Sequence, residues 1–118
     1  MKLSINGIKE QEAWKKAGIA LPGYDVEAAS ENAKENPVWV HFGIGNIFRV
    51  FIGGIADGLL EEGVLDRGIT CVETFDYDVV DKIYDPYDNL GLSVIVHGDG
   101  IREYKVIGAL AETGKAHA

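Results

Sequence analysis

The amino-acid sequence predicts an α/β fold with a strand–helix–strand unit at its centre. Two short runs of apolar and β-branched residues, at positions 38–42 and 69–72, have the composition and length of buried strands. The segment between them, residues 46–62, has apolar residues at helical spacing, and a glycine-rich turn precedes it. Strands that alternate with helices are typical of α/β domains, so the pattern predicts a βαβ unit.

The chain is long enough for one compact domain with an apolar core. It has 118 residues, of which 47% are hydrophobic and 25% charged. These proportions match those of soluble globular proteins and differ from the low hydrophobicity of disordered chains. A chain of this length does not comfortably form two domains. We therefore divide it into an N-terminal helical extension, residues 1–36, and one domain, residues 37–118.

Charge and hydropathy argue against nucleic acid and membranes as partners. Acidic residues outnumber basic ones, 19 to 11, and the net charge of −8 repels phosphate backbones and anionic lipids. No apolar run approaches the roughly 20 residues of a membrane-spanning helix. The first residues become charged before any signal-like apolar region can form. We therefore expect a cytoplasmic protein.

Neither a disulfide framework nor a metal-binding motif is present. Cys71 is the single cysteine, and its place in the apolar run 69–72 predicts a buried strand residue rather than a nucleophile. His97 and Asp99 lie at a predicted hairpin tip, where two ligands do not enclose a metal ion. We expect no metal site.

Two short helices are expected in the extension. The first, residues 9–17, ends at Gly18, and the second, residues 26–34, follows Asp25, a residue type that caps helix N-termini. Both helices contain few large apolar side chains. We therefore expect them to lie on the surface of the domain that follows.

The domain is expected to begin with a buried strand at residues 38–42, which ends at Gly43. A long helix follows at residues 46–62, with four apolar side chains spaced four positions apart: Ile47, Phe51, Ile55 and Leu59. The second strand covers residues 69–72 and ends in an acidic segment. These elements complete the βαβ unit.

The rest of the chain shows weaker patterns. A short helix is expected at residues 79–84, before a cluster of helix-breaking residues at 85–89. Residues 92–96 and 103–110 have the composition of strands, and the Asp-Gly pair between them predicts a hairpin. The tail, residues 112–118, shows no packing pattern.

The turn between the first strand and the long helix has the composition of a phosphate-binding loop. Gly43 and Gly45 occupy the first two glycine positions of the pattern G-x-G-x-x-G, and Phe48 replaces the third. Glycine lets the backbone turn tightly and approach a pyrophosphate, while free N–H groups and the positive end of the helix stabilise its negative charge. Paired glycines also occur in ordinary strand–helix turns, so the turn alone is weak evidence.

Acidic residues at the end of the second strand strengthen the case for a dinucleotide. Glu73 lies 25 positions after Phe48, near the spacing of about 20 at which a carboxylate accepts hydrogen bonds from the adenosine ribose. A carboxylate there repels a 2′-phosphate, which favours NAD over NADP. Asp76 is a second candidate, with capping of the following helix as an equal alternative. The sequence therefore predicts a Rossmann-like dinucleotide-binding domain.

These residues resemble the N-terminal part of a known family, the long-chain polyol dehydrogenases, which includes mannitol dehydrogenase, mannitol-phosphate dehydrogenase and the fructuronate and tagaturonate reductases. The resemblance is carried by the segment HFGIGNIFRVF, residues 41–51, which is similar to the family pattern G-x-G-N-x-x-R followed by a small residue and an aromatic residue or histidine. It extends over residues 37–112. Val50 departs from the pattern, since glycine or alanine is common there in the family.

The resemblance implies NAD as the cofactor and hydride transfer between NAD(H) and a polyol or sugar acid. Arg49 is expected to orient the loop or bind the phosphates, with a structural ion pair as the alternative. In the family, the catalytic lysine, asparagine and histidine come from a later, mostly helical domain, so no catalytic residue is expected in this chain. The candidate cofactor-binding residues are Gly43, Ile44, Gly45, Asn46, Ile47, Phe48, Arg49, Glu73 and Asp76.

We expect the domain to be truncated. A doubly wound dinucleotide domain uses six strands in the order 3-2-1-4-5-6, whereas this sequence offers about four. An unpaired edge on the first strand would favour self-association. The leading hypothesis is the NAD-binding part of a polyol or sugar-acid oxidoreductase whose substrate is bound by a missing C-terminal domain. A stand-alone, non-catalytic nucleotide-binding or regulatory module is the alternative, and a small α+β interaction protein is a third.

Overall fold

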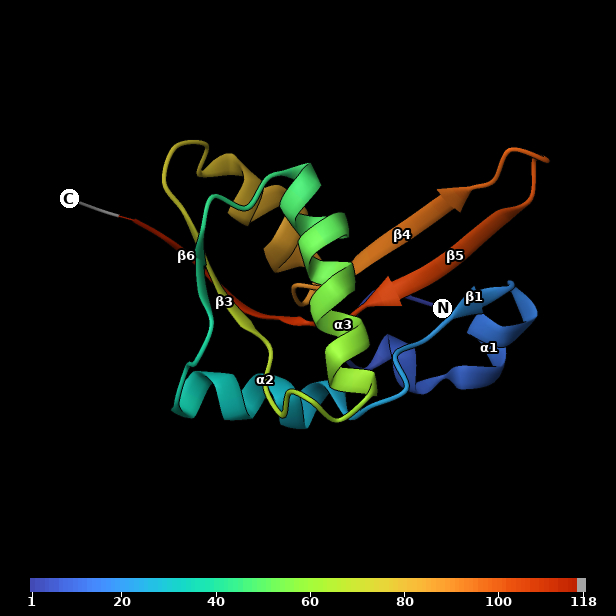
Figure 1. The fold of residues 1–118 in the computed structure, drawn as a ribbon, viewed down its shortest axis with the longest axis horizontal. Helices are drawn as coiled ribbons and strands as arrows, with labels where there is room; N and C mark the ends of the chain where they lie inside the picture. Colours follow the sequence, from blue (N-terminus) through green and yellow to red (C-terminus); the bar gives the residue numbers. More distant parts are fainter. Residues whose placement is uncertain (117–118) are drawn as a thin grey trace.

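The computed structural model describes residues 1–116 and places them in two three-stranded sheets with helices around them (Figure 1). The molecule measures 45 × 27 × 25 Å. The hairpin of β4 and β5 projects from one end, and β6 runs toward the other. The helices are α1 (Gln11–Lys16), α2 (Val26–Glu35) and α3 (Gly53–Glu61), and the strands are β1 (Ile19–Ala20), β2 (Val40–Phe42), β3 (Ile69–Glu73), β4 (Gly91–Val96), β5 (Arg102–Ile107) and β6 (Leu110–Lys115).

The first sheet contains the βαβ unit that the sequence predicts. β2 and β6 both pair in parallel with β3, so β3 is the central strand. In chain order these are the first, second and third strands of the unit, and their spatial order, 3-2-1, is that of one half of a doubly wound dinucleotide-binding sheet. The predicted α/β, Rossmann-like fold class is confirmed.

β2 lies at the edge of this sheet, because within residues 1–116 only β3 pairs with it. Its side chains are correspondingly exposed, Val40 by 46% and Phe42 by 64%. The prediction of a buried first strand is therefore wrong for this chain. The apolar composition of the strand indicated burial, whereas no strand in the described part of the chain covers its outer edge.

The helix after the glycine turn is continuous from residue 46 to residue 61 and includes a wider, π-helical segment, Phe48–Ile52, before α3. Its buried row of side chains comprises Phe48, Ala56 and Leu60. The row singled out in the sequence faces outward instead, with exposed fractions of 81% for Ile47, 63% for Phe51 and 50% for Ile55. Both rows have four-residue spacing, so the spacing predicted the helix but not its buried side.

The second sheet has the strand order β1-β5-β4. β4 and β5 form the antiparallel hairpin that the Asp-Gly pair predicts, and Gly100 at its tip has a φ of +89°. β1 pairs in parallel with β5 and was not predicted, because a strand of two residues carries no periodicity. This sheet joins the N-terminal extension to the domain.

The strand predicted at residues 103–110 is in fact parts of two strands. β5 ends at Ile107, and β6 begins at Leu110 in the other sheet. β6 then pairs with β3 as far as Lys115, which lies opposite Glu73. The prediction of a tail without packing is wrong for residues 112–115, and residues 117–118 lie outside the described part of the chain. The polar side chains of β6 give no hydrophobic pattern, although its backbone pairs with β3.

Both helices of the extension are confirmed, and both are attached to the domain. The Asp25 carboxylate accepts the N–H of Ala28 at 3.0 Å and caps α2, as predicted. Trp14 on α1 is buried and belongs to a cluster with Leu90 and Val106. These contacts hold the extension against the second sheet.

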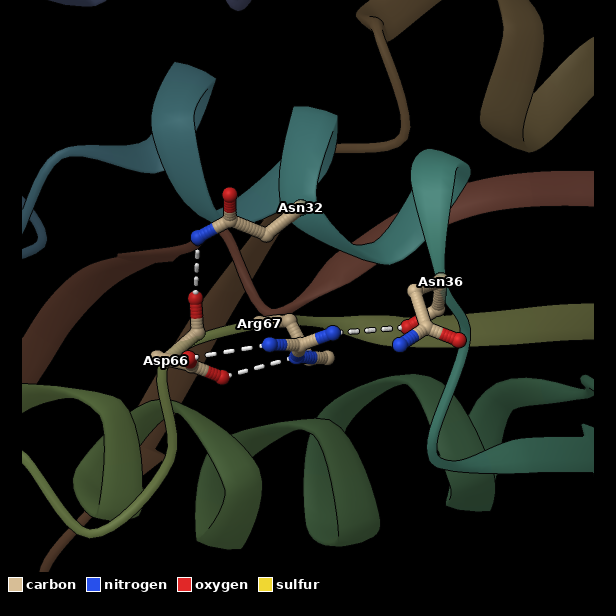
Figure 2. A network of polar contacts seen from close by, with 4 residues as sticks. All are labelled: Asn32, Asn36, Asp66 and Arg67. Carbon is tan, nitrogen blue, oxygen red and sulfur yellow. Dashed lines mark hydrogen bonds and ion pairs between the residues drawn. The ribbon is translucent and has the colours of Figure 1, made fainter.

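A polar network joins the end of α2 to the loop before β3 (Figure 2). Arg67 donates two hydrogen bonds to the Asp66 carboxylate, at 2.7 and 3.0 Å, and one to the Asn36 carbonyl, at 2.8 Å. The Asn32 amide donates to the Asp66 carbonyl at 2.9 Å. The network fixes the entry to β3, the strand that ends at Glu73.

Candidate functional site

The candidate site lies at the carboxyl ends of β2 and β3, which are parallel neighbours. Phe42 is paired with Val72, and the Gly43 N–H donates to the Val72 carbonyl at 2.8 Å. Gly43 then has a φ of +89°, a left-handed conformation that glycine adopts without the strain a Cβ would cause. The chain therefore turns sharply at the edge of the sheet where ligands bind in open α/β folds.

Backbone N–H groups are available where the turn enters the helix. The first hydrogen bond of the helix runs from the Arg49 N–H to the Gly45 carbonyl at 3.0 Å, so the N–H groups of residues 46–48 precede it and have no partner within the helix. Gly45 is exposed, and a Cβ added to it would meet no atom within 4 Å. The turn is thus open beside Gly45, at the positive end of the helix dipole.

Two of the predicted site residues face the interior. Ile44 is 0% and Phe48 5% exposed, and the Phe48 ring lies on that of His41 with centroids 4.2 Å apart. Phe48 thus occupies the third glycine position of the G-x-G-x-x-G pattern, and its side chain packs in the core. The side chains of Ile44 and Phe48 hold the turn in place, and only their backbone atoms can meet a ligand.

A residue that the sequence analysis did not assign to the site contacts the turn from inside. The hydroxyl of Tyr84, which is fully buried, donates a hydrogen bond to the Ile44 carbonyl at 2.9 Å. Tyr84 ends the helical segment Val80–Tyr84, which follows β3. The sequence predicted this short helix, but it contains no signal for a contact between residues 40 positions apart.

The two acidic candidates have different surroundings. Glu73 is 7% exposed, and its Oε1 accepts the backbone N–H groups of Thr74 at 2.9 Å and Phe75 at 3.3 Å. These bonds orient the carboxylate at the end of β3. Asp76 is exposed, and the Val79 N–H bonds to its backbone carbonyl rather than to its carboxylate. Within residues 1–116, the Asp76 carboxylate therefore does not cap the helical segment that follows it.

The remaining candidates lie on the first turn of the helix. Asn46 and Ile47 are exposed. Arg49 is partly buried, and its Cγ would lie 3.6 Å from a Cβ added to Gly91 at the start of β4, so the aliphatic part of Arg49 packs there. Within the described residues the structure shows no ion pair between Arg49 and a carboxylate. It therefore gives no support to a structural ion pair as the role of Arg49.

Three lysines of the domain each have a carboxylate partner. A neighbouring carboxylate stabilises the protonated form of an amine, whereas a general base must give up its proton. None of these lysines therefore has the surroundings of a general base. The pairs are Lys105 with Glu61 at 2.9 Å, Lys82 with Asp78 at 3.5 Å and Lys115 with Asp81 at 2.9 Å.

Cys71 is a structural residue, as predicted. It is fully buried in β3, and burial raises the pKa of its thiol to about 12. The thiol therefore stays protonated and is not a nucleophile at neutral pH. Residues 1–116 contain no group of three or more side chains placed to hold a metal ion.

Known proteins resemble the chain in sequence and in structure. Over 115 residues, 98% of the chain, it is 46% identical to D-mannonate oxidoreductase of Thermotoga maritima. The structure of D-sorbitol dehydrogenase in its substrate-free form matches 85% of the chain with a TM-score of 0.69 and 27% identity. The resemblance to the polyol dehydrogenases is confirmed. A further polyol dehydrogenase, Pseudomonas fluorescens mannitol 2-dehydrogenase in a ternary complex with NAD and D-mannitol, shares the fold over 83% of the chain, with a TM-score of 0.62 and 21% identity.

The chain spans about one fifth of these polyol dehydrogenases. It covers 21% of the mannonate oxidoreductase, 20% of the sorbitol dehydrogenase and 19% of the mannitol dehydrogenase. No protein-family model matches it. Within residues 1–116, no helix is both long and apolar enough to cross a membrane.

Proposed function

We propose that the chain is the NAD-binding, N-terminal part of an oxidoreductase that transfers hydride between NAD(H) and a sugar acid or polyol. One observation carries the proposal: the open turn at Gly45 and the oriented carboxylate of Glu73 lie at the ends of two adjacent parallel strands. A dinucleotide has a pyrophosphate and an adenosine ribose, and this pair of groups can bind both.

The residues present fit NAD. The space that a Cβ at Gly45 would occupy is open, so a pyrophosphate can approach the N–H groups of residues 46–48, with Arg49 as a further donor. Glu73 accepts hydrogen bonds from the ribose hydroxyls, with the exposed Asp76 as a second acceptor. Bound NAD supplies the hydride acceptor, and the chain's own residues hold and orient it.

A sugar acid is the better supported substrate class. The 46% identity to the mannonate oxidoreductase extends over 98% of the chain, whereas the sorbitol and mannitol dehydrogenases share 27% and 21%. We place the catalytic residues and the substrate contacts outside these 118 residues, because Lys82, Lys105 and Lys115 are each paired with a carboxylate and lack the surroundings of a general base.

Calorimetric titration of the 118-residue chain with NAD, NADP and ADP-ribose tests the cofactor assignment. We expect binding of NAD and ADP-ribose, weaker binding of NADP, and loss of all three in Gly45→Trp, whose side chain fills the open space. Gly98→Trp is the matched control, since a Cβ at Gly98 also meets no atom within 4 Å. Binding that survives in Gly45→Trp would exclude the turn as the pyrophosphate site.

A turnover assay tests the second half of the proposal. We expect the 118-residue chain to form no NADH from NAD with D-mannonate, D-mannitol or D-sorbitol, because we place the general base outside it. NADH formation by the purified chain with any of these substrates would show that the chain contains the catalytic residues and would overturn that placement.

A further inference from the structure

The hydrogen bond between Tyr84 and Ile44 fixes the direction of one peptide group in the glycine turn. The Ile44 carbonyl points inward to the buried Tyr84 hydroxyl at 2.9 Å. The peptide bond between Ile44 and Gly45 is trans, since residues 1–116 contain no cis peptide bond. In a planar trans peptide the C=O and the N–H point in opposite directions. The Gly45 N–H therefore points away from Tyr84, toward the side where Gly45 is exposed.

Tyr84 is a stable donor for this contact. It is 0% exposed and lies in the same core cluster as Ile44 and Phe48, so its ring is fixed by packing. Burial raises the pKa of its phenol, so the hydroxyl keeps the proton that it donates. Its helical segment, Val80–Tyr84, also packs against β6. The helical segment that follows β3 thus fixes the glycine turn that follows β2.

We infer that Tyr84 is a positioning residue for the dinucleotide: by holding the Ile44 carbonyl inward, it presents the Gly45 N–H outward to the pyrophosphate. The inference rests on the proposed function and adds a residue outside the glycine pattern. Without the hydroxyl, the peptide group between Ile44 and Gly45 can rotate. Ordering of the Gly45 N–H on binding then reduces the binding free energy of the ligand.

The variant Tyr84→Phe tests the inference, because it removes the hydroxyl and keeps the ring that fills the core. Calorimetry on the 118-residue chain should show affinities for NAD and for ADP-ribose reduced by about three- to tenfold, the loss that corresponds to one hydrogen bond. Tyr87→Phe is the matched control, since Tyr87 is 43% exposed and lies three positions away. It should bind both ligands as the natural chain does.

Amide hydrogen exchange measured by NMR without ligand supplies a second readout. In Tyr84→Phe the hydrogen-bonded amides that flank the turn, those of Gly43 and Arg49, should exchange faster. The amides of β3, where exchange requires wider unfolding, should remain protected. A purely structural role for Tyr84 would lower the stability of the whole domain without this local change, and ligand affinity measured well below the unfolding temperature would stay the same.

The outcomes separate the inference from the proposed function. If the natural chain binds neither NAD nor ADP-ribose, the proposed function fails and the inference fails with it. If the natural chain binds both and Tyr84→Phe binds them equally well, the proposed function stands and the role of Tyr84 is overturned. Weaker binding in Tyr84→Phe but not in Tyr87→Phe, together with faster exchange in the turn, supports the inference.

Discussion

The hydroxyl of Tyr24 donates a hydrogen bond to the buried carboxylate of Asp57 and so links the N-terminal extension to α3. Asp57 is 1% exposed, and the same oxygen accepts the N–H of Gly108 at 3.0 Å. The Lys105 ammonium group lies 3.5 Å from the other carboxylate oxygen. One buried carboxylate therefore connects the extension, α3 and the segment between β5 and β6.

Removal of the Tyr24 hydroxyl should destabilise the chain. In Tyr24→Phe the buried Asp57 carboxylate loses a donor, and we expect the free energy of unfolding to fall by about 1–3 kcal/mol. Urea denaturation followed by circular dichroism measures the change. Tyr87→Phe, at an exposed tyrosine, should change it by less than about 0.5 kcal/mol. Equal effects of the two variants would show that the contact with Asp57 contributes no stability.

The stability of the chain should also depend on pH through Asp57. Desolvation raises its pKa above the ordinary value of 3.8, although the bonds from Tyr24 and Gly108 and the charge of Lys105 oppose the shift. The folded chain thus binds this proton more tightly than the unfolded chain, and the stabilisation due to the protonated form is lost as the pH rises from 3.8 through the folded pKa. The nearby Glu61 carboxylate acts in the same direction as desolvation.

Comparison with Asp57→Asn isolates this effect, because the amide does not titrate while all other groups are unchanged. We expect the free energy of unfolding of the natural chain, relative to that of the variant, to decrease as the pH rises above the ordinary carboxyl pKa of 3.8. Urea denaturation of both proteins at a series of pH values gives the difference. A difference that stays constant, or increases with pH, would contradict a raised pKa.

The elements that the sequence predicted correctly are those with a local physical signal. Gly18, Asp25 and the hairpin Asp-Gly pair specify helix ends and turns through their own backbone preferences. The failures concern long-range pairing. Residues 112–115 form part of β6 through backbone bonds to β3, and their polar side chains give no hydrophobic pattern. The exposure of β2 follows from which strands lie beside it, and no local pattern encodes that.

The same distinction applies to the candidate site. Gly43 and Glu73 were located because the turn and the end of the strand demand particular residue types. The inward direction of Ile44 and Phe48, and the contact from Tyr84, depend on how the second helical segment packs on the first turn. The sequence specified which backbone groups could meet a ligand, and the packing specifies how they are held.

The two glycines of the turn should respond differently to alanine. Gly43 has a φ of +89°, at which a Cβ is strained, so Gly43→Ala should lower the free energy of unfolding by about 1–2 kcal/mol. Gly45 lacks a positive φ, and a Cβ there meets no atom within 4 Å, so Gly45→Ala should cost less than about 0.5 kcal/mol. Thermal and urea denaturation of both variants check the contrast. Equal losses would mean that the turn is not held in the left-handed conformation at Gly43.

Charge at Glu73 should set the choice between NAD and NADP. Glu73→Arg replaces a carboxylate that repels a 2′-phosphate by a cation that attracts it, so we expect the preference to reverse toward NADP. Glu73→Gln keeps an acceptor for the N–H of Thr74 and should weaken NAD binding without reversing the preference. Glu62→Arg, at the exposed residue that directly follows α3, controls for the change in net charge. If Glu73→Arg keeps the natural preference, as the control does, Glu73 does not contact the ribose.

The uncovered edge of β2 should make the chain self-associate. Within residues 1–116 its outer backbone groups have no partner strand, and Val40 and Phe42 expose apolar surface beside them. An edge of this kind pairs with another chain, and a charged residue on it prevents the pairing. We expect sedimentation velocity to show concentration-dependent association of the natural chain and a shift toward monomer in Val40→Lys. Ile101→Lys, in the turn of the β4–β5 hairpin of the other sheet and 60% exposed, should associate as the natural chain does. A monomeric natural chain would contradict the prediction directly, and equal association of both lysine variants would place the contact on another surface.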